Sequence, residues 1–273
     1  MNYDFEAVSQ VNTTIQILVL ILCIALLAIR QHRKRINTQI VMVMCAIGCY
    51  LASDLYWTVF ISMYSHNELA GISPVELGEI GMCLFLMAAL RIEKVSDNKL
   101  SALKYAAIIF FCLVNGVCWT YWRGSVLNTL LSMIGLLPLC IVNASTIEGC
   151  TLYGKTGQRL FFGELILVAV VQFGTISTHG ILFEFLDVLA YALWLAGWAA
   201  LIVLWIRAIR DYSRHENIGP EPLAITVNMV CFDFFALYAS EGIMYCFNDA
   251  MTTVAFTLMT VSLMRREYRY DLL

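Results

Sequence analysis

Residues 13–35 read TTIQILVLILCIALLAIRQHRKR, an apolar run (13–29) that ends in a basic cluster. At about 1.5 Å per helical residue the run is ~26 Å long, close to the ~30 Å hydrocarbon core of a bilayer. Asp4 and Glu6 precede it, where a cleavable signal peptide would carry positive charge. This stretch therefore predicts a membrane-spanning helix that starts outside and ends in the cytoplasm.

The composition of the whole chain agrees with this prediction. Of its 273 residues, 60% are hydrophobic and only 14% are charged. Soluble domains are nearer 45–50% apolar and about 25% charged. A soluble or disordered chain is therefore excluded, and the lipid bilayer is the expected partner. No basic domain is present, so we expect no nucleic-acid partner.

Similar apolar runs recur along the sequence. They lack the alternation of barrel strands, so each is predicted to be a helix, because a backbone at bilayer depth must satisfy its own hydrogen bonds. The expected fold is an all-α, polytopic transmembrane bundle with one domain (1–264) and a cytoplasmic exit segment (265–273). The nine predicted spans are 13–29, 38–63, 75–91, 101–121, 125–146, 160–180, 185–206, 222–246 and 249–264.

The positive charges support both the span count and the orientation. If the N-terminus is outside and the C-terminus inside, Arg123 alone among the 17 lysine and arginine residues falls on the outer side. Short loops between the spans fit a multi-pass protein of a bacterial plasma membrane. A homodimer remains open, because the sequence says nothing of oligomeric state.

Ionisable residues inside a span are costly and are therefore candidate site residues. Asp54 lies in the outer half of the second span, and it shares a helix face with Tyr50 and Trp57 at spacings of four and three residues. Asp233 falls near the middle of the eighth span, where it is expected to be a buried switch or coupling carboxylate. Glu241 follows two turns later.

Three more polar residues are expected at the outer depth. Glu79 lies one turn inside the third span, and Gln172 and His179 form a stripe on the sixth. Together these groups predict a crevice that opens outside and binds a cationic or polyhydroxylated small molecule, or protons. The alternative is that the same groups only bond helices to one another. The expected ligand-binding set is Asp54, Tyr50, Trp57, Glu79, Gln172, His179 and Glu241.

Simpler roles are expected for other polar and small residues. Asp249 is expected to be a solvated turn residue between the last two spans. Gly78 and Gly81 are expected to allow close helix packing. Gly135 and Pro138 interrupt the fifth span, where a proline usually kinks a helix. They predict either a hinge or, more commonly, a static kink.

No sequence motif points to chemistry. The metalloprotease, nucleophile-elbow and phosphate-loop motifs are absent. Nearly all ten cysteines fall in apolar runs, which is typical of packing residues. We therefore predict no catalytic residue, no metal and no cofactor, although an intramembrane enzyme assembled from separate helices stays a third alternative.

The end of the chain carries a resemblance. Residues 265–267 (Arg-Arg-Glu) and 271–273 (Asp-Leu-Leu) resemble the junction between the last membrane helix and the catalytic domain of bacterial membrane-bound diguanylate cyclases. Asp54-Leu-Tyr-Trp57 followed by Pro74 is similar to their multi-helix input regions. The resemblance implies a sensory input module, with any cyclase activity in a domain absent from this sequence.

Two main functions follow. The first is a receptor-like input module that responds to an outer-side or membrane ligand and signals through its cytoplasmic C-terminal helix. The second is a small secondary transporter or proton-coupled carrier, in which Asp54 and Asp233 would be the coupling carboxylates and Pro138 would mark a broken helix. The midplane position of Asp233 favours the second, and the charged helical exit favours the first.

Overall fold

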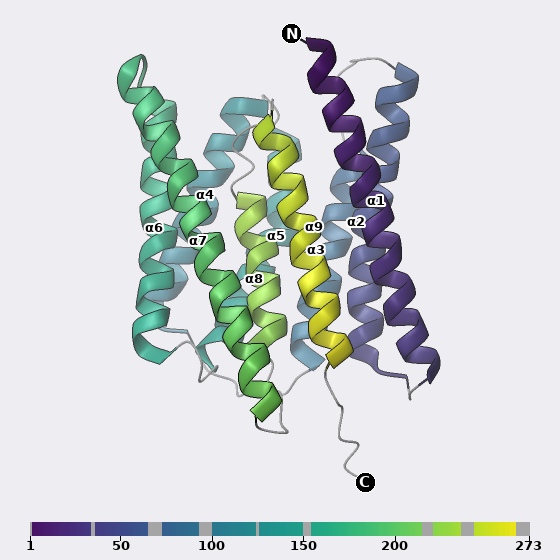
Figure 1. The fold of residues 1–273 in the computed structure, drawn as a ribbon. Helices are drawn as coiled ribbons and strands as arrows, with labels where there is room; N and C mark the ends of the chain where they lie inside the picture. Colours follow the sequence, from purple (N-terminus) through teal and green to yellow (C-terminus); the bar gives the residue numbers. More distant parts are fainter. Residues whose placement is uncertain are drawn as a thin grey trace.

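The computed structural model describes residues 2–33, 36–64, 73–92, 100–123, 126–149, 154–214, 221–235 and 243–265. Within these ranges every regular element is an α-helix (Figure 1), so the all-α prediction is confirmed. The helices are α1 (Asn2–Arg33), α2 (Thr38–Tyr64), α3 (Pro74–Ile92), α4 (Ala102–Arg123), α5 (Val126–Glu148), α6 (Gly154–Ser177), α7 (Ile181–Arg214), α8 (Glu221–Phe235) and α9 (Ile243–Arg265).

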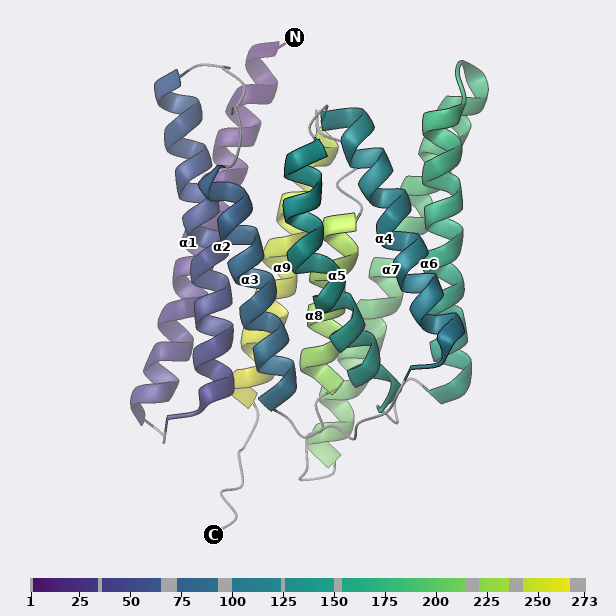
Figure 2. The ribbon, with the colours of Figure 1, turned by 180° about the vertical axis from the view of Figure 1, so that it is seen from behind.

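The helices form one bundle with roughly parallel axes (Figures 1 and 2). Packed neighbours run in the order α9, α1, α2, α3, α5, α4, α6, α7, α8 and back to α9, and α5 also packs against α8. Helices α1 and α2 therefore lie at one edge of the bundle, and α6 and α7 lie at the other (Figure 2). Helix α1 begins at the end of the bundle opposite to the end where α9 stops (Figure 1).

Two helix starts follow from capping residues in the sequence. Asn37 precedes α2, and its Oδ1 accepts a hydrogen bond from the Gln39 backbone N–H at 2.8 Å. Ser73 precedes α3, where Glu76 reaches back to accept hydrogen bonds from both the backbone N–H and the hydroxyl of Ser73. Ser-Pro-Val-Glu is thus a capping box, and Glu76 has a structural role at the start of the helix.

Helices α1 and α7 extend well beyond the predicted spans. They have 32 and 34 residues, against predicted runs of 13–29 and 185–206. At ~1.5 Å per residue each is about 50 Å long, which exceeds a ~30 Å hydrocarbon core. Hydropathy marks only the apolar part of a helix, and no proline or glycine stops either helix near the edges of that part.

The prediction of one span over 222–246 is wrong. Helix α8 has 15 residues and ends at Phe235, and residues 243–246 belong to the first turn of α9. At about 22 Å, α8 is too short to cross the hydrocarbon core. Every residue from Pro222 to Asp233 is buried. Helix α8 is therefore enclosed by its neighbours α3, α5, α7 and α9, and no side of this stretch is left for lipid.

Among the described residues, five helices have the length and composition to cross a membrane: α1, α2, α4, α5 and α7. Helix α9 has the length but carries many polar side chains. Asn248, Thr252, Thr260 and Ser262 are all buried. These groups lower its hydropathy because they face the interior of the bundle and not lipid.

The predicted close packing at Gly78 and Gly81 is confirmed. A Cβ atom at Gly78 would lie 2.8 Å from the backbone oxygen of Cys49 and closer still to the Ser53 hydroxyl, and one at Gly81 would lie 3.0 Å from Cys49 Sγ. Gly135 has the same function between α5 and α3, because its Cβ would lie 3.2 Å from Ile80 Cα. Helix α5 continues through Pro138 to Glu148, so the described structure contains no break at the predicted hinge.

We expect Gly78→Ala to destabilise the protein by about 1–3 kcal/mol, because the new methyl group would force apart the α2 and α3 backbones. Gly48→Ala is the matched control on α2, since nothing lies within 4 Å of its added Cβ. It should be neutral or slightly stabilising. Thermal unfolding of the purified variants in detergent measures both, and equal melting temperatures would contradict this packing.

Candidate interior acidic site

Four carboxylates from four helices gather inside the bundle: Asp54 on α2, Glu79 on α3, Asp233 on α8 and Asp249 on α9. We refer to these four residues as the interior acidic site. Asp249 and Glu79 both lie within electrostatic range of Asp54. Asp249 also lies within electrostatic range of Asp233. Asp249 therefore connects Asp54 and Glu79 to Asp233, the carboxylate at the end of α8.

Contacts between α2 and α3 fix the relative levels of Asp54 and Glu79. Ser53 Oγ lies 3.2 Å from the carbonyl oxygen of Val75, which places the first turn of α3 beside Asp54. Glu79 follows one turn later, and its Oε2 accepts a hydrogen bond from the Ser132 hydroxyl on α5 at 3.2 Å. The end of the site that holds Asp54 and Glu79 is thus bounded by α2, α3 and α5.

Asp233 is the most enclosed member of the site, with an exposed fraction of 0%. The hydroxyl of Thr252 on α9 donates a hydrogen bond to its Oδ2, whereas Oδ1 has no hydrogen-bond partner. Trp198 of α7 is also fully buried, and its indole N–H lies close enough to this carboxylate to be a hydrogen-bond donor. Its indole N–H makes no well-formed hydrogen bond.

The aspartates of the site have no cationic partner within the described part of the chain. The ion pair found there joins Lys104 to Glu148, on α4 and α5. Oδ2 of Asp54 is buried without a hydrogen bond. Like charges in a poorly solvated interior repel each other and lose hydration, so an uncompensated set of this kind is unfavourable. A proton or a bound cation would relieve that cost.

Tyr50 lies one turn below Asp54 and is part of the packed interior. Its hydroxyl accepts a hydrogen bond from Gln16 Nε2 of α1 at 3.1 Å. Its ring packs on Phe256 of α9 with 5.4 Å between centroids. Tyr50 thus joins α1, α2 and α9 directly beneath the acidic site.

Trp57 does not line the same interior space. It is 37% exposed and stacks on Phe60 of its own helix. The reason is that α3 starts level with Ser53, so the last turns of α2 extend beyond this neighbour. The expected shared face of Tyr50, Asp54 and Trp57 is therefore buried at Tyr50 and exposed at Trp57.

Gln172 and His179 are not brought to the acidic site. Gln172 is buried on α6, which packs against α4 and α7 at the opposite edge of the bundle from α2 (Figure 2). His179 is exposed and lies after the end of α6 at Ser177, so the expected helical stripe stops before it. Gly180 follows with a φ of 69°, a left-handed conformation that ends a helix readily. Glu241 lies outside the described residues.

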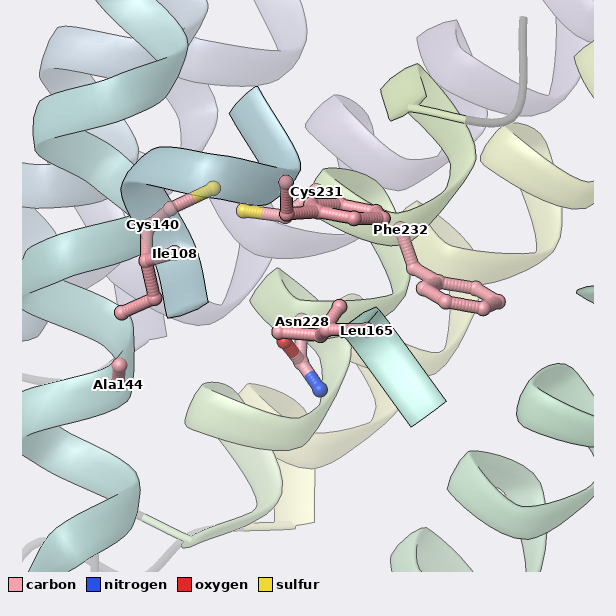
Figure 3. Close-up of a pocket in the computed structure, with 8 residues that line it drawn as sticks. Ile108, Cys140, Ala144, Leu165, Asn228, Cys231 and Phe232 are labelled. Carbon is pink, nitrogen blue, oxygen red and sulfur yellow. The ribbon is translucent and has the colours of Figure 1, made fainter. Parts of the chain in front are cut away.

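A small cavity lies between α4, α5, α6 and α8, lined by Ile108, Phe111, Cys140, Ala144, Leu165, Asn228, Cys231 and Phe232 (Figure 3). Its volume of about 20 Å³ suits one water molecule and no larger ligand. The sulfur atoms of Cys140 and Cys231 point toward each other across it (Figure 3). None of the four carboxylates lines this cavity, which is therefore separate from the acidic site.

Sequence reasoning missed Asp249, Thr252, Trp198 and Gln16. Asp249 was expected in a solvated turn, but it lies in the second turn of α9 and is only partly exposed. This error follows directly from the misplaced end of the eighth span. Gln16 is 2% exposed, and its signal was a lone amide inside the most apolar run of the chain. An interfacial tryptophan would be found near the end of a helix, but Trp198 lies far from either end of α7.

Comparisons with known proteins identify no relative of this chain: no protein family, no curated protein and no solved structure matches it. The described residues include no group of three or more histidine, cysteine, aspartate or glutamate side chains arranged to hold a metal ion. Function must therefore be argued from the acidic site and from the helices that carry it.

Proposed function

We propose that this protein is the sensory input module of a membrane signalling system. A cationic or polyhydroxylated ligand from the outer side, or protons, would act on the interior acidic site, and the response would leave along α9. One observation carries this proposal. Helix α9 holds Asp249 and Thr252 in its first half and runs without interruption to Arg265, about 24 Å further along.

In this proposed mechanism, the charge of the acidic site controls the separation of α2 and α9. Neutralising Asp54 or Asp249 removes repulsion between α2 and α9, and the preferred separation of these two helices changes. A ligand shifts such an equilibrium only as far as its affinities for the two arrangements differ. Tyr50 and Phe256 hold α2 against α9 below the site, so a change at the site is passed to the inner halves of both helices.

We further propose a multi-pass arrangement in a bacterial plasma membrane, with nine helices embedded, the N-terminus outside and the C-terminus in the cytoplasm. Supporting this orientation, Arg30, Arg91, Arg207 and Arg265 lie near the last residues of α1, α3, α7 and α9, which end on the same side of the bundle (Figure 1). Arg123 ends α4 on the other side.

Reporter fusions test this orientation. A reporter that is active only in the cytoplasm should work when fused after Arg265 and fail when fused after Arg123. A periplasmic reporter should show the reverse pattern. Activity of the cytoplasmic reporter at Arg123 would contradict the proposed topology.

A secondary transporter is the second candidate, favoured by α8. A helix of 15 residues that ends inside the bundle beside a buried carboxylate resembles the broken helices that bind substrates and ions in transporters. Uptake of ²²Na⁺ and of labelled spermidine into proteoliposomes separates the two candidates. The sensor predicts no flux above that of protein-free liposomes. Saturable flux that Asp233→Asn abolishes would overturn the sensor in favour of the transporter.

A further inference from the structure

Several oxygen atoms around the end of α8 are incompletely hydrogen bonded. Oδ1 of Asp233 and Oδ1 of Asn248 are both buried without a hydrogen-bond partner. The side chains concerned are 0% and 7% exposed. The hydroxyl of Thr252 contacts Asp233 Oδ2 and lies 3.4 Å from the backbone carbonyl oxygen of Asn248. Asn248 and Thr252 are one turn apart on α9.

Buried acceptors without donors are expensive, and a buried carboxylate more so. The Thr252 hydroxyl donates its single proton to Asp233, and the nearby Trp198 indole N–H, the other donor there, makes no well-formed hydrogen bond. No lysine, arginine or histidine of the described chain pairs with Asp233. The remaining acceptors are therefore best satisfied by a cation, which interacts with several oxygen atoms at once.

The chemistry of these oxygen ligands limits which cations could bind. Carboxylate, amide and hydroxyl oxygens are hard ligands that suit hard cations and not soft metals. Within the described chain no three acidic, histidine or cysteine side chains are placed to hold a divalent metal. One buried carboxylate with neutral oxygen partners matches a single positive charge. Asp233 also lies in the last turn of α8, where backbone carbonyl groups give a helix its negative end.

We propose that Asp233, Asn248 and Thr252 form a binding site for an alkali cation that joins the end of α8 to α9. The site lies deeper than the outer carboxylates Asp54 and Glu79. It goes beyond the proposed function, since it requires only that the ion binds and not that the protein signals. An ion bound here would hold α9 against the central helix of the bundle.

Purified protein in nanodiscs provides the test. Melting temperatures are measured in rising NaCl or KCl, with choline chloride at equal ionic strength as the reference, together with equilibrium binding of ²²Na⁺. A ligand that binds the native state alone raises stability in proportion to ln(1 + [L]/Kd). We expect stabilisation by Na⁺ or K⁺ and none by choline. The ion that stabilises at the lower concentration identifies the preferred alkali cation.

Variants assign the effect to these residues. Thr252→Val keeps the shape of the side chain and removes its hydroxyl, and Asp233→Asn removes the charge. Each should weaken alkali-cation affinity by roughly 10- to 100-fold, as losses around metal sites do. Thr257→Val is the control on the same helix, because its hydroxyl bonds only to the backbone of Thr253 at 2.9 Å. It should leave affinity unchanged.

Equal stabilisation by choline, or unchanged affinity in Thr252→Val, would overturn the cation site. The use of Thr252→Val and direct ²²Na⁺ binding keeps the test valid even if Asp233→Asn folds poorly. Failure of the site is distinguishable from failure of the proposed function. Signalling is read from the position of the inner end of α9, which can respond to the outer carboxylates whether or not an ion binds below them.

Discussion

Neutralising Asp54 and Asp249 together (Asp54→Asn with Asp249→Asn) is expected to stabilise the folded protein. Both carboxylates lie in the interior and within electrostatic range of each other, and neither forms an ion pair within the described residues. Removing such charges removes repulsion and desolvation cost. Functional sites often carry this type of strain, and relieving it commonly gains about 0.5–2 kcal/mol per site.

Whether the double variant is more or less stable than the wild type distinguishes two roles for the acidic site. Carboxylates that only hold helices together would lose favourable hydrogen bonds when replaced by asparagine, and stability would fall. If the carboxylates serve to bind a ligand, replacing them with asparagine would give a more stable protein that no longer responds to that ligand. Thermal unfolding in nanodiscs at neutral pH measures the difference. A lower melting temperature for the double variant would show that these two aspartates act as structural bonds.

Phe256→Ala is expected to be the most destabilising single truncation that we propose. Phe256 is fully buried on α9, and its ring packs on Tyr50 of α2. Removing a buried phenylalanine side chain leaves a cavity and typically costs about 3–5 kcal/mol. The loss should also loosen Tyr50, whose hydroxyl bonds to Gln16 of α1.

Phe110→Ala is the matched control for that truncation. Phe110 lies on α4 with 42% of its surface exposed, on a face that lipid would cover. The same loss of atoms there leaves no enclosed cavity, so we expect at most about 1 kcal/mol of destabilisation. Both variants can be compared by thermal or denaturant unfolding in the same detergent. Similar losses at both positions would contradict the placement of Phe256 in the core.

Helix content could be predicted from hydropathy because apolar runs and capping residues are local features. The start of α8 could be predicted from Pro222, but its end could not. Residues 222–246 contain no proline after Pro222, and the isolated charges of Asp233 and Glu241 are too few to divide the run by hydropathy. Helix α8 packs against α5, α7 and α9, and such contacts between distant segments are not visible in a local sequence pattern.

The acidic site could be predicted only in part for a related reason. Depth along a helix follows from counting residues, so the levels of Asp54, Glu79 and Asp233 could be predicted. Lateral position depends on which helices are neighbours. Asp54 and Glu79 come together because α2 and α3 are consecutive and packed, whereas Gln172 lies on α6 at the far edge. Asp249 was not predicted to belong to the site, because its helix was predicted to begin at residue 249, six residues later than Ile243.

The central claim is that the charge of the interior acidic site sets the position of the inner end of α9. It is tested most directly by electron paramagnetic resonance distances between genetically encoded spin labels at Met264 on α9 and Ile92 on α3, which are both exposed. Wild type, Asp54→Asn/Asp249→Asn and the control Thr257→Val are compared in nanodiscs without added ligand. We predict a shifted distance distribution in the double variant alone. Identical distributions in all three proteins would contradict the account.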